Sequence, residues 1–407
     1  MLATSLPIGH KEPTFSILEG VRVLDLTTSI AGPYATMLLS DFGADVIKVE
    51  RRGGDDARFW GPPFLDGESL WFLSVNRNKR SVRLDFSTVE GRAVLDAMLD
   101  KADVVVTNQT KDVQLKLGMT PDQLRSGRDR LVVASITGFG LTGRNASKPC
   151  YDLIAEGYSG IMDLTGPSDA APQKVGAPAA DMLAGNDAAM AVLAALYRRQ
   201  QTGQGATVDI ALTESMVRFT SPRITPYLGS GEVSRRTGGR DSVIAVYQTF
   251  DTADEPLTLS LGTDRIWQRF WELVQRPEMG LDPELASNAQ RRERREEIVA
   301  AIQDILLHKP RAEWLELLAG AGVPAGPIYR VDEVTDDAHF HDRNLFFQIP
   351  RDGHSLPQVG LGIQLDGKAA GYRSAPPRLG EHTHEVLGDM LGYTPEQIEL
   401  LSNDKII

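Results

Sequence analysis

An aspartate at the start of an apolar segment is the strongest candidate for covalent chemistry in this sequence. Asp181 lies in GAPAADMLAGNDAAM, and the residues after it have helical spacing and run to the basic, Gly-rich end YRRQQTGQG. A carboxylate there can cap the helix by accepting backbone N–H groups, and the helix dipole favours its ionised form. Where water is excluded, the same group is a nucleophile toward an activated carbonyl carbon. The residues alone leave both roles open.

A second carboxylate on the same helix is not placed to work with Asp181. Asp187 follows six residues later, which turns it by roughly 240° around a helix. The spacing therefore argues against a face-sharing pair of acid and base carboxylates.

Positive charge gathers near two expected strands, although the whole chain carries a formal net charge of -12. Ligands of parallel sheets bind at strand ends, and arginine forks grip phosphate groups. The cluster therefore indicates either a site for a multiply anionic small molecule or a solvated loop. Its members are Lys48, Arg51, Arg52, Arg77, Lys79 and Arg80.

Motifs for other chemistries are incomplete. The loop SIAGP lies where a dinucleotide-binding protein carries GxGxxG, and Glu50 follows where a ribose-binding acid would stand, but the three glycines are missing. The seven histidines fall in neither HExxH nor a Cys/His cluster, and GxSxG is absent. We therefore expect no metal and no serine nucleophile, and a nicotinamide dehydrogenase stays only as an alternative.

The elements that must position these residues alternate between strand and helix. VRVLDLT, ADVIKVE, SVRLDF and DVVVTN are apolar and β-branched, and helical patterns such as YATMLLSDFG and VEGRAVLDAMLDKA separate them. This alternation predicts an α/β fold with a large, doubly wound, Rossmann-like domain. The hairpin-like VIAVYQTFDTADEPLTLSLG and the amphipathic helices after it predict a smaller α+β domain.

The expected domain boundaries follow from shifts in composition. Residues 1–221 form the first part of the large domain, and the Pro-, Gly- and Arg-containing stretch 222–239 is an irregular linker. Residues 240–330 form the small domain, and residues 331–407 form a linker and a C-terminal return to the large domain.

Composition is that of an ordered protein that is not exported. The 407 residues are 42% hydrophobic and 24% charged, close to globular averages. No uninterrupted apolar run reaches the roughly 18 residues of a membrane span, and MLATSLPIGHKEPTF lacks a secretion signal. The single cysteine, Cys150, excludes an internal disulfide, and the acidic balance disfavours general binding of nucleic acid. We expect a cytoplasmic protein without nucleic-acid or membrane partners.

Several separated blocks resemble one family, the class III coenzyme A transferases of the CaiB/BaiF type, which also includes acyl-CoA racemases. They cover nearly the whole chain, from LEGVRVLDLTTSIAGPYATMLLSDFGADVIKVE to PPRLGEHTHEVL. GGDDARFWGPPF, SVNRNKRSVRLDF, ASITGFGLTG, YDLIAEGYSGIMDLTG and GVPAGPIYRVDEV look closest to the branch typified by succinate–hydroxymethylglutarate CoA-transferase. The resemblance implies CoA exchange between dicarboxylates and an interlocked homodimer.

The resemblance also implies roles for particular residues. Asp181 matches the catalytic aspartate of these enzymes, which favours the nucleophile over the cap. Tyr151 is expected to contact the substrate. Apart from the resemblance, the second carboxylate of a diacid needs a basic partner, and Arg240 is the candidate. The residues that fall where family members contact CoA are Ile30, Ala31, Arg51, Leu84, Asn108, Gln109 and Lys116.

Two departures from the family pattern bear on the reaction. The racemases carry a histidine base before an aspartate, whereas this chain has Tyr151 before Asp152, so proton exchange at an α-carbon loses its base. Formyl-CoA transferases shield their intermediates with four glycines, and the nearest counterpart here is TGGRD at 237–241.

The function implied by the resemblance is therefore CoA transfer from an acyl-CoA, such as succinyl-CoA, to a carboxylate. The expected intermediates are an Asp181 mixed anhydride and an aspartyl-CoA thioester. An acyl-CoA racemase and a non-catalytic CoA-binding protein are the alternatives.

Overall fold

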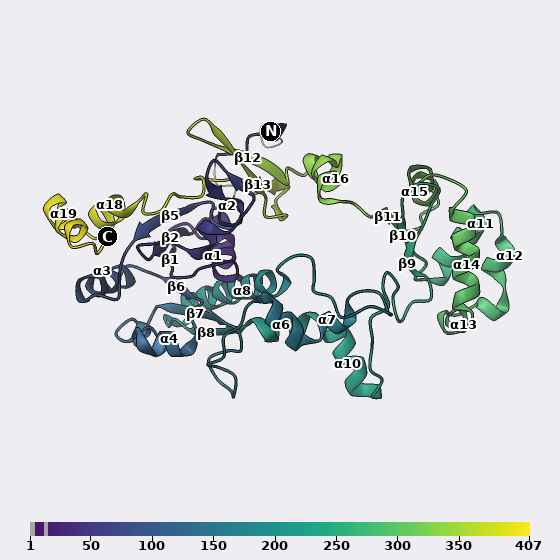
Figure 1. Ribbon diagram of the computed structural model, residues 1–407, viewed down its shortest axis with the longest axis horizontal. Coiled ribbons are helices and arrows are strands. Elements are labelled where there is room, and N and C mark those ends of the chain that lie inside the picture. Colours follow the sequence, from purple (N-terminus) through teal and green to yellow (C-terminus); the bar gives the residue numbers. More distant parts are fainter. Residues whose placement is uncertain (1–4, 12–14) are drawn as a thin grey trace. The chain divides into compact units, whose positions relative to one another are not determined.

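The computed structural model describes residues 5–11 and 15–407, and its main feature is a sheet of six parallel strands. The spatial order is β5-β2-β1-β6-β7-β8, and every neighbouring pair is parallel (Figure 1). Numbered along the chain, this is the 3-2-1-4-5-6 order of dinucleotide-binding folds, in which the order reverses between the first and fourth strands. The predicted α/β class with a parallel sheet is confirmed. The strands are β1 Arg22–Asp25, β2 Asp45–Glu50, β5 Lys79–Arg83, β6 Val104–Thr107, β7 Val132–Thr137 and β8 Thr207–Ala211.

The chain divides into two compact units, each of which is described by itself. Unit 1 consists of Met1–Gly160, Val175–Ser221 and Asp337–Ile407, and unit 2 consists of Ile161–Lys174 and Pro222–Asp336. Compactness alone does not show that a unit folds independently, so the predicted domain boundaries stay a prediction.

Unit 1 contains the parallel sheet, the helices that cover it and several small hairpins. Its helices and helical turns are α1 Ala31–Asp41, η2 Asp56–Phe59, α2 Leu70–Ser74, α3 Val89–Leu99, α4 Lys111–Lys116, α5 Pro121–Arg125, α6 Asp152–Ser159, α8 Ala179–Thr202, α9 Leu212–Phe219, α17 Ala338–Asp342, α18 Thr383–Glu385, η4 Val386–Met390 and α19 Pro395–Asn403. Its short antiparallel strands are β3 Phe64–Leu65, β4 Glu68–Ser69, β12 Phe346–Arg351, β13 His354–Val359, β14 Gln364–Leu365 and β15 Lys368–Ala369.

Helices cover both faces of the parallel sheet, because successive strand residues point to opposite faces. On one face α1 and α8 pack against each other and against the strands. Gly185 permits this close crossing, since a Cβ there would lie 2.8 Å from the carbonyl oxygen of Ala31. On the other face Leu24 and Ile47 join a buried core with α3, and Leu387 from the C-terminal segment completes it. The start of α8 is therefore held by its packing on α1.

Among the described residues, one helix, α8, has the length and the apolar composition needed to cross a membrane. Core helices of soluble proteins pass the same test. Its small side chains, among them Ala184, Ala188 and Val192, are buried inside unit 1.

Unit 2 combines a three-stranded antiparallel sheet with a layer of helices. The predicted hairpin is present as β9 and β10, and Trp267, Phe270 and Trp271 of α11 fill the core beneath it. The stretch expected to be an irregular linker instead begins with helix α10, which accommodates Pro226 within it. The elements are α7 Ile161–Leu164, α10 Ser221–Ser230, β9 Tyr247–Phe250, β10 Leu257–Ser260, α11 Asp264–Leu273, α12 Pro277–Leu281, η3 Pro283–Leu285, α13 Asn288–Glu293, α14 Arg295–Leu306, α15 Arg311–Gly320, β11 Ala325–Pro327 and α16 Val331–Asp336.

Candidate active site

Asp181 lies in the first turn of α8, two residues after the helix begins at Ala179. Pro178 stands at the N-cap position and makes no side-chain bond to the helix amides. The Asp152 carboxylate takes that role, because its Oδ1 accepts from the backbone N–H of Ala180 at 2.8 Å and of Asp181 at 3.3 Å. The cap function considered for Asp181 therefore belongs to Asp152, and the Asp181 side chain is left for other contacts.

The electrostatic surroundings of Asp181 disfavour its charge. Burial raises the pKa of the Asp181 carboxyl from 3.8 to about 7, and the negative charge of Asp152 adds to the rise. Both effects oppose ionisation. A carboxylate of this basicity is a stronger nucleophile and base than a free aspartate, and such perturbed groups concentrate at active sites.

The start of α1 packs against α8 one helical turn after Asp181. Gly185 is the residue at this point, so Asp181 and Gly185 share a face of α8. Ala31 and Tyr34 pack against Gly185. The expected CoA contacts Ile30 and Ala31, both buried at the start of α1, are thus next to the helix that carries Asp181.

A cavity of about 410 Å³ in unit 1 lies at the carboxyl ends of strands β1, β2, β5 and β6. Ligands of open α/β sheets bind at this edge, where the strand order reverses. Three of the seven expected CoA contacts, Arg51, Leu84 and Gln109, line the cavity together with Thr28 and Asp55. The structure therefore brings these three residues together around a space suited to a ligand.

The other expected CoA contacts have different positions. Asn108 does not line the cavity itself but holds Thr28, which does. Its side-chain Oδ1 accepts from Thr28 N at 3.0 Å, and its Nδ2 donates to Thr28 O at 2.7 Å. Lys116 is exposed at the end of α4. Among the described residues, Ile30, Ala31, Asn108 and Lys116 are not part of the cavity lining.

The two lysines of the predicted basic cluster are not available to a ligand. Lys48 and Lys79 are fully buried. The Lys48 ammonium nitrogen lies 2.8 Å from Asp55 Oδ2, and that of Lys79 lies 3.0 Å from Asp25 Oδ2. Lys48 also donates to the carbonyl oxygen of Thr27 at 2.8 Å. These internal ion pairs hold the loops that line the 410 Å³ cavity.

The arginines of that cluster are divided between the two edges of the sheet. Strand β5 begins at Lys79, so Arg77 and Arg80 lie near its amino end, away from the cavity. Arg77 pairs with buried Asp41 at 2.6 Å, and Arg80 pairs with Asp45. Of the two interpretations left open for the cluster, neither describes all six residues, since Lys48, Arg77 and Lys79 are buried in ion pairs and Arg51 is the member that lines the cavity.

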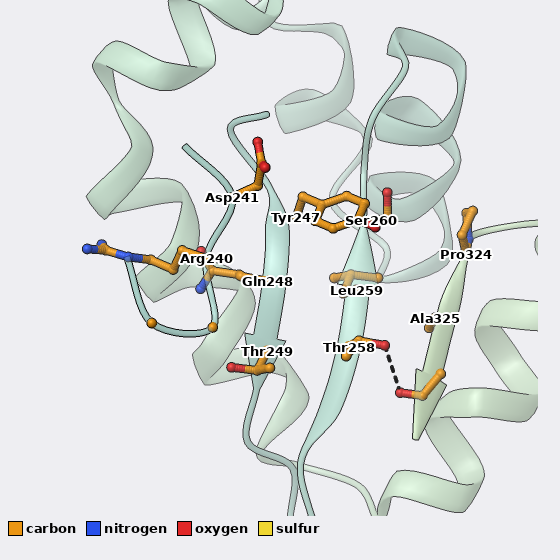
Figure 2. Close-up of a pocket in the computed structure, with 13 residues that line it drawn as sticks. Arg240, Asp241, Tyr247, Gln248, Thr249, Thr258, Leu259, Ser260, Pro324 and Ala325 are labelled. Carbon is orange, nitrogen blue, oxygen red and sulfur yellow. Dashed lines mark hydrogen bonds between the residues drawn. The ribbon is translucent and has the colours of Figure 1, made fainter. Parts of the chain in front are cut away.

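Unit 2 has a cavity of its own, of about 580 Å³, between the loop 238–241 and the strands β9, β10 and β11 (Figure 2). Arg240 is part of its lining, together with Tyr247, Thr249 and Ser260. In Figure 2 the Arg240 side chain extends away from Tyr247 and Ser260, so its guanidinium is exposed. Asp181 belongs to unit 1 and is not in this lining.

Tyr151 directly precedes helix α6 and its side chain is 72% exposed. No group of three His, Cys, Asp or Glu side chains in the described ranges 5–11 and 15–407 is arranged to hold a metal ion. His339 and His341 lie on α17.

Sequence reasoning missed the role of Asp152, which is 29 residues before Asp181. The signal that could have found it is Pro178, since a proline cannot cap a helix with its side chain and the first amides of α8 then need an acceptor from elsewhere. The buried partners Asp25 and Asp55 of the two lysines were also missed. The sequence pattern does not distinguish a lysine in a buried strand from one at its solvated end.

Comparisons with known proteins agree on one family. The model of CoA-transferase family III matches residues 18–383. Succinyl-CoA:glutarate CoA-transferase from Mus musculus is 35% identical over 392 residues, covering 94% of this chain and 88% of the relative. Succinyl-CoA:mesaconate CoA-transferase from Haloarcula hispanica is 36% identical, covering 91% of this chain and 96% of the relative.

Solved structures agree with this result. A CAIB/BAIF family protein from Brucella suis is similar with a TM-score of 0.81 and 35% sequence identity, over 92% of this chain and 99% of that one. The family model, these curated relatives and the solved structure all indicate the same class of enzyme. The chain belongs to CoA-transferase family III and is a CoA-transferase.

Proposed function

We propose that the enzyme moves CoA from succinyl-CoA to a second dicarboxylate through Asp181. Two of its relatives are a succinyl-CoA:glutarate and a succinyl-CoA:mesaconate CoA-transferase, which supports succinyl-CoA as donor and a dicarboxylate as acceptor. The observation that carries the proposal is the Asp181 carboxyl, which is partly buried in the first turn of α8 and has a pKa raised to about 7 by burial and by Asp152. The reaction is proposed to take place in the cytoplasm.

The first half of the proposed reaction loads the enzyme. A carboxylate oxygen of Asp181 attacks the thioester carbonyl carbon of succinyl-CoA, and the C–S bond breaks to give a mixed anhydride and CoA thiolate. The thiolate then attacks the side-chain carbonyl carbon of Asp181. Succinate leaves with the bridging oxygen and its electron pair, and an aspartyl-CoA thioester remains.

The second half repeats these steps in reverse with the acceptor. A carboxylate oxygen of the acceptor attacks the aspartyl thioester and releases CoA thiolate, which then attacks the acceptor carbonyl of the new anhydride. Asp181 leaves as a carboxylate. Because one thioester replaces another, the enzyme chiefly has to supply positioning, stabilisation of oxyanions and exclusion of water.

The cavity of unit 1 is the proposed site for the nucleotide end of CoA, and Arg51 is its proposed phosphate contact. We expect Arg51→Ala to raise the Kd of CoA by about 3- to 10-fold at low salt, because an exposed charge-assisted bond contributes about 1 kcal/mol. Isothermal titration calorimetry measures this change. Arg52→Ala is the matched control, since Arg52 is exposed, adjacent and outside the cavity lining. Equal effects of both variants would contradict the assignment.

Arg240 and Tyr151 are the proposed contacts of the dicarboxylate. Arg240 belongs to the lining of the unit 2 cavity, which carries several hydroxyl groups. Tyr151 directly precedes α6 in unit 1, and its side chain is exposed. A panel of succinate, glutarate, hydroxymethylglutarate, mesaconate, citramalate, itaconate and oxalate, with product CoA thioesters identified by mass, tests the acceptor class. A preference for monocarboxylates would contradict the proposal.

We further propose that the enzyme is a homodimer. Helices α6, α8 and α9 pack together in unit 1 and expose large apolar side chains, among them Ile154, Tyr158, Met190 and Phe219. Exposed apolar patches of this kind mark protein interfaces. Interlocking of the two copies is part of this proposal.

Met190→Glu is expected to convert the dimer into monomers, because it places a charge in the apolar face of α8. Light scattering coupled to size-exclusion chromatography measures the mass. Leu400→Glu is the matched control, since Leu400 is 62% exposed on α19, away from these three helices. A monomeric wild type would contradict the homodimer.

The central experiment incubates the enzyme with succinyl-CoA alone, reduces the product with borohydride or captures it with hydroxylamine, and maps the modified peptide by mass spectrometry. The proposal requires an adduct on Asp181. Adducts elsewhere, or none, would reject it. Deuterium uptake at an α-carbon without CoA exchange would instead favour the racemase, for which the chain has Tyr151 where the family base is histidine.

A further inference from the structure

The N-terminus of α8 is completed by a carboxylate from another helix. Pro178 offers no side-chain acceptor, yet the Ala180 and Asp181 amides both donate to Asp152 Oδ1. Asp152 is itself the first residue of α6, in the same unit. The nucleophile proposed above is therefore tied through its own backbone to Asp152.

This bond has an electrostatic consequence for Asp181. Amides at a helix N-terminus normally stabilise a nearby negative charge. Here two of these amides are already bonded to an anion, and Asp152 stands close enough for its charge to raise the pKa of Asp181. The helix therefore offers Asp181 less stabilisation than its position in the first turn would suggest.

Other titratable groups near this helix do not duplicate the effect. Cys150 interacts with Asp181, but burial, followed by the charge of Asp181, raises the pKa of its thiol to about 11, so it is uncharged at neutral pH. Several other titratable or charged side chains on α8 and on the elements packed against it have partners other than Asp181; among them are Tyr34, Glu156, Asp187, Arg199, Asp209 and Arg218.

We infer that Asp152 is a positioning residue that fixes the start of α8 through the Ala180 and Asp181 amides and holds a negative charge beside the Asp181 carboxylate. The inference rests on the proposed role of Asp181 as nucleophile. Basicity helps the first step, in which Asp181 attacks the thioester carbonyl carbon.

The same charge directs the second step. In the mixed anhydride, CoA thiolate can attack either carbonyl carbon. Attack at the Asp181 carbon expels the substrate carboxylate with the bridging oxygen and its electron pair, whereas attack at the substrate carbon expels Asp181. A second negative charge beside Asp152 is disfavoured. Attack at the Asp181 carbon therefore prevails. The mixed anhydride is converted to the aspartyl-CoA thioester, which accumulates, and does not return to succinyl-CoA.

The test is the pH dependence of kcat/KM for succinyl-CoA in Asp152→Asn. Asparagine keeps an oxygen that accepts from the two amides but removes the charge. We expect the wild-type acid limb near pH 7 to move down by about one pH unit, because a like charge is removed. We also expect a smaller fraction of the enzyme to carry CoA after incubation with succinyl-CoA, measured by intact mass. Asp152→Ser is a second neutral acceptor, to be used if the asparagine variant does not fold.

Asp187→Asn is the matched control, since it removes a carboxylate of the same helix that is bonded to Ser215 and Arg218. Its acid limb should stay in place. An acid limb that stays in place in the neutral Asp152 variants as well would overturn the inference, while CoA transfer by the wild type would leave the proposed function intact. A wild type without transfer or adduct would instead reject the proposed function.

Discussion

Asp181→Asn is expected to lower kcat for CoA transfer by about 10⁴-fold or more, on the scale seen when a catalytic nucleophile is removed. The amide has nearly the same shape, but its nitrogen and oxygen are poor nucleophiles toward a thioester. The measurement is steady-state transfer from succinyl-CoA to glutarate, together with intact mass after incubation with succinyl-CoA alone. The variant should form no covalent CoA adduct.

Stability separates loss of chemistry from loss of fold in this variant. The fold raises the pKa of Asp181 above its value of 3.8 in a free chain, so ionisation of Asp181 lowers the free energy of unfolding. This loss of stability is absent below pH 3.8 and complete above about pH 7. Asp181→Asn removes this cost. At pH 8 the variant should therefore be more stable than the wild type, by on the order of 1–3 kcal/mol. An Asp181→Asn variant that is inactive and also less stable than the wild type at pH 8 would contradict the assignment of Asp181 as the nucleophile, since its inactivity would follow from loss of the fold.

Asp25→Ala is expected to destabilise unit 1 by about 3–5 kcal/mol, because it leaves the Lys79 ammonium buried without its anionic partner. Asp25 is fully buried and also accepts from the Thr36 hydroxyl at 2.7 Å and from Thr27 N at 3.0 Å. Burial already lowers the pKa of Lys79 to about 8, even though Asp25 opposes this shift. Loss of Asp25 favours the neutral amine further. Hydrogen exchange of unit 1 peptides in urea measures the effect.

An exposed ion pair provides the control for Asp25. Arg51 and Asp56 form a pair in which both side chains are more than half exposed. Asp56→Ala should therefore cost no more than about 1 kcal/mol. Similar unfolding midpoints for the two variants would show that the buried pair does not stabilise unit 1. The double change Asp25→Leu with Lys79→Met should recover part of the loss, since it removes both buried charges.

The sheet could be predicted from the sequence because its signals are local. Apolar, β-branched runs mark β1, β2 and β6, and the polar ends of the intervening helices separate them clearly. The β9–β10 hairpin was visible for the same reason. The inclusion of residues 161–174 in unit 2 could not be predicted, because packing between segments far apart in the chain leaves no periodic pattern.

The site could be predicted only in part. Asp181 was proposed from its place at the start of an apolar helix and from a family resemblance that extends over nearly the whole chain, and its role stays a prediction. Its partner Asp152 comes from another helix, and a hydrogen bond between distant segments is not encoded in spacing. Lys48 and Lys79 were expected either in an anion site or in a solvated loop, but both are buried and paired with Asp55 and Asp25.

The C-terminal segment has a consequence for how the protein is made. Val386, Leu387, Ile406 and Ile407 are buried in the same core as Leu24 of the first strand. During synthesis this core lacks one of its walls until residue 407 has left the ribosome. The segments of unit 2 end at Asp336, whereas unit 1 still needs residues 337–407, so the core behind the parallel sheet closes only after unit 2 has been synthesised. A chaperone that shields the open sheet during this interval would raise the yield of active enzyme.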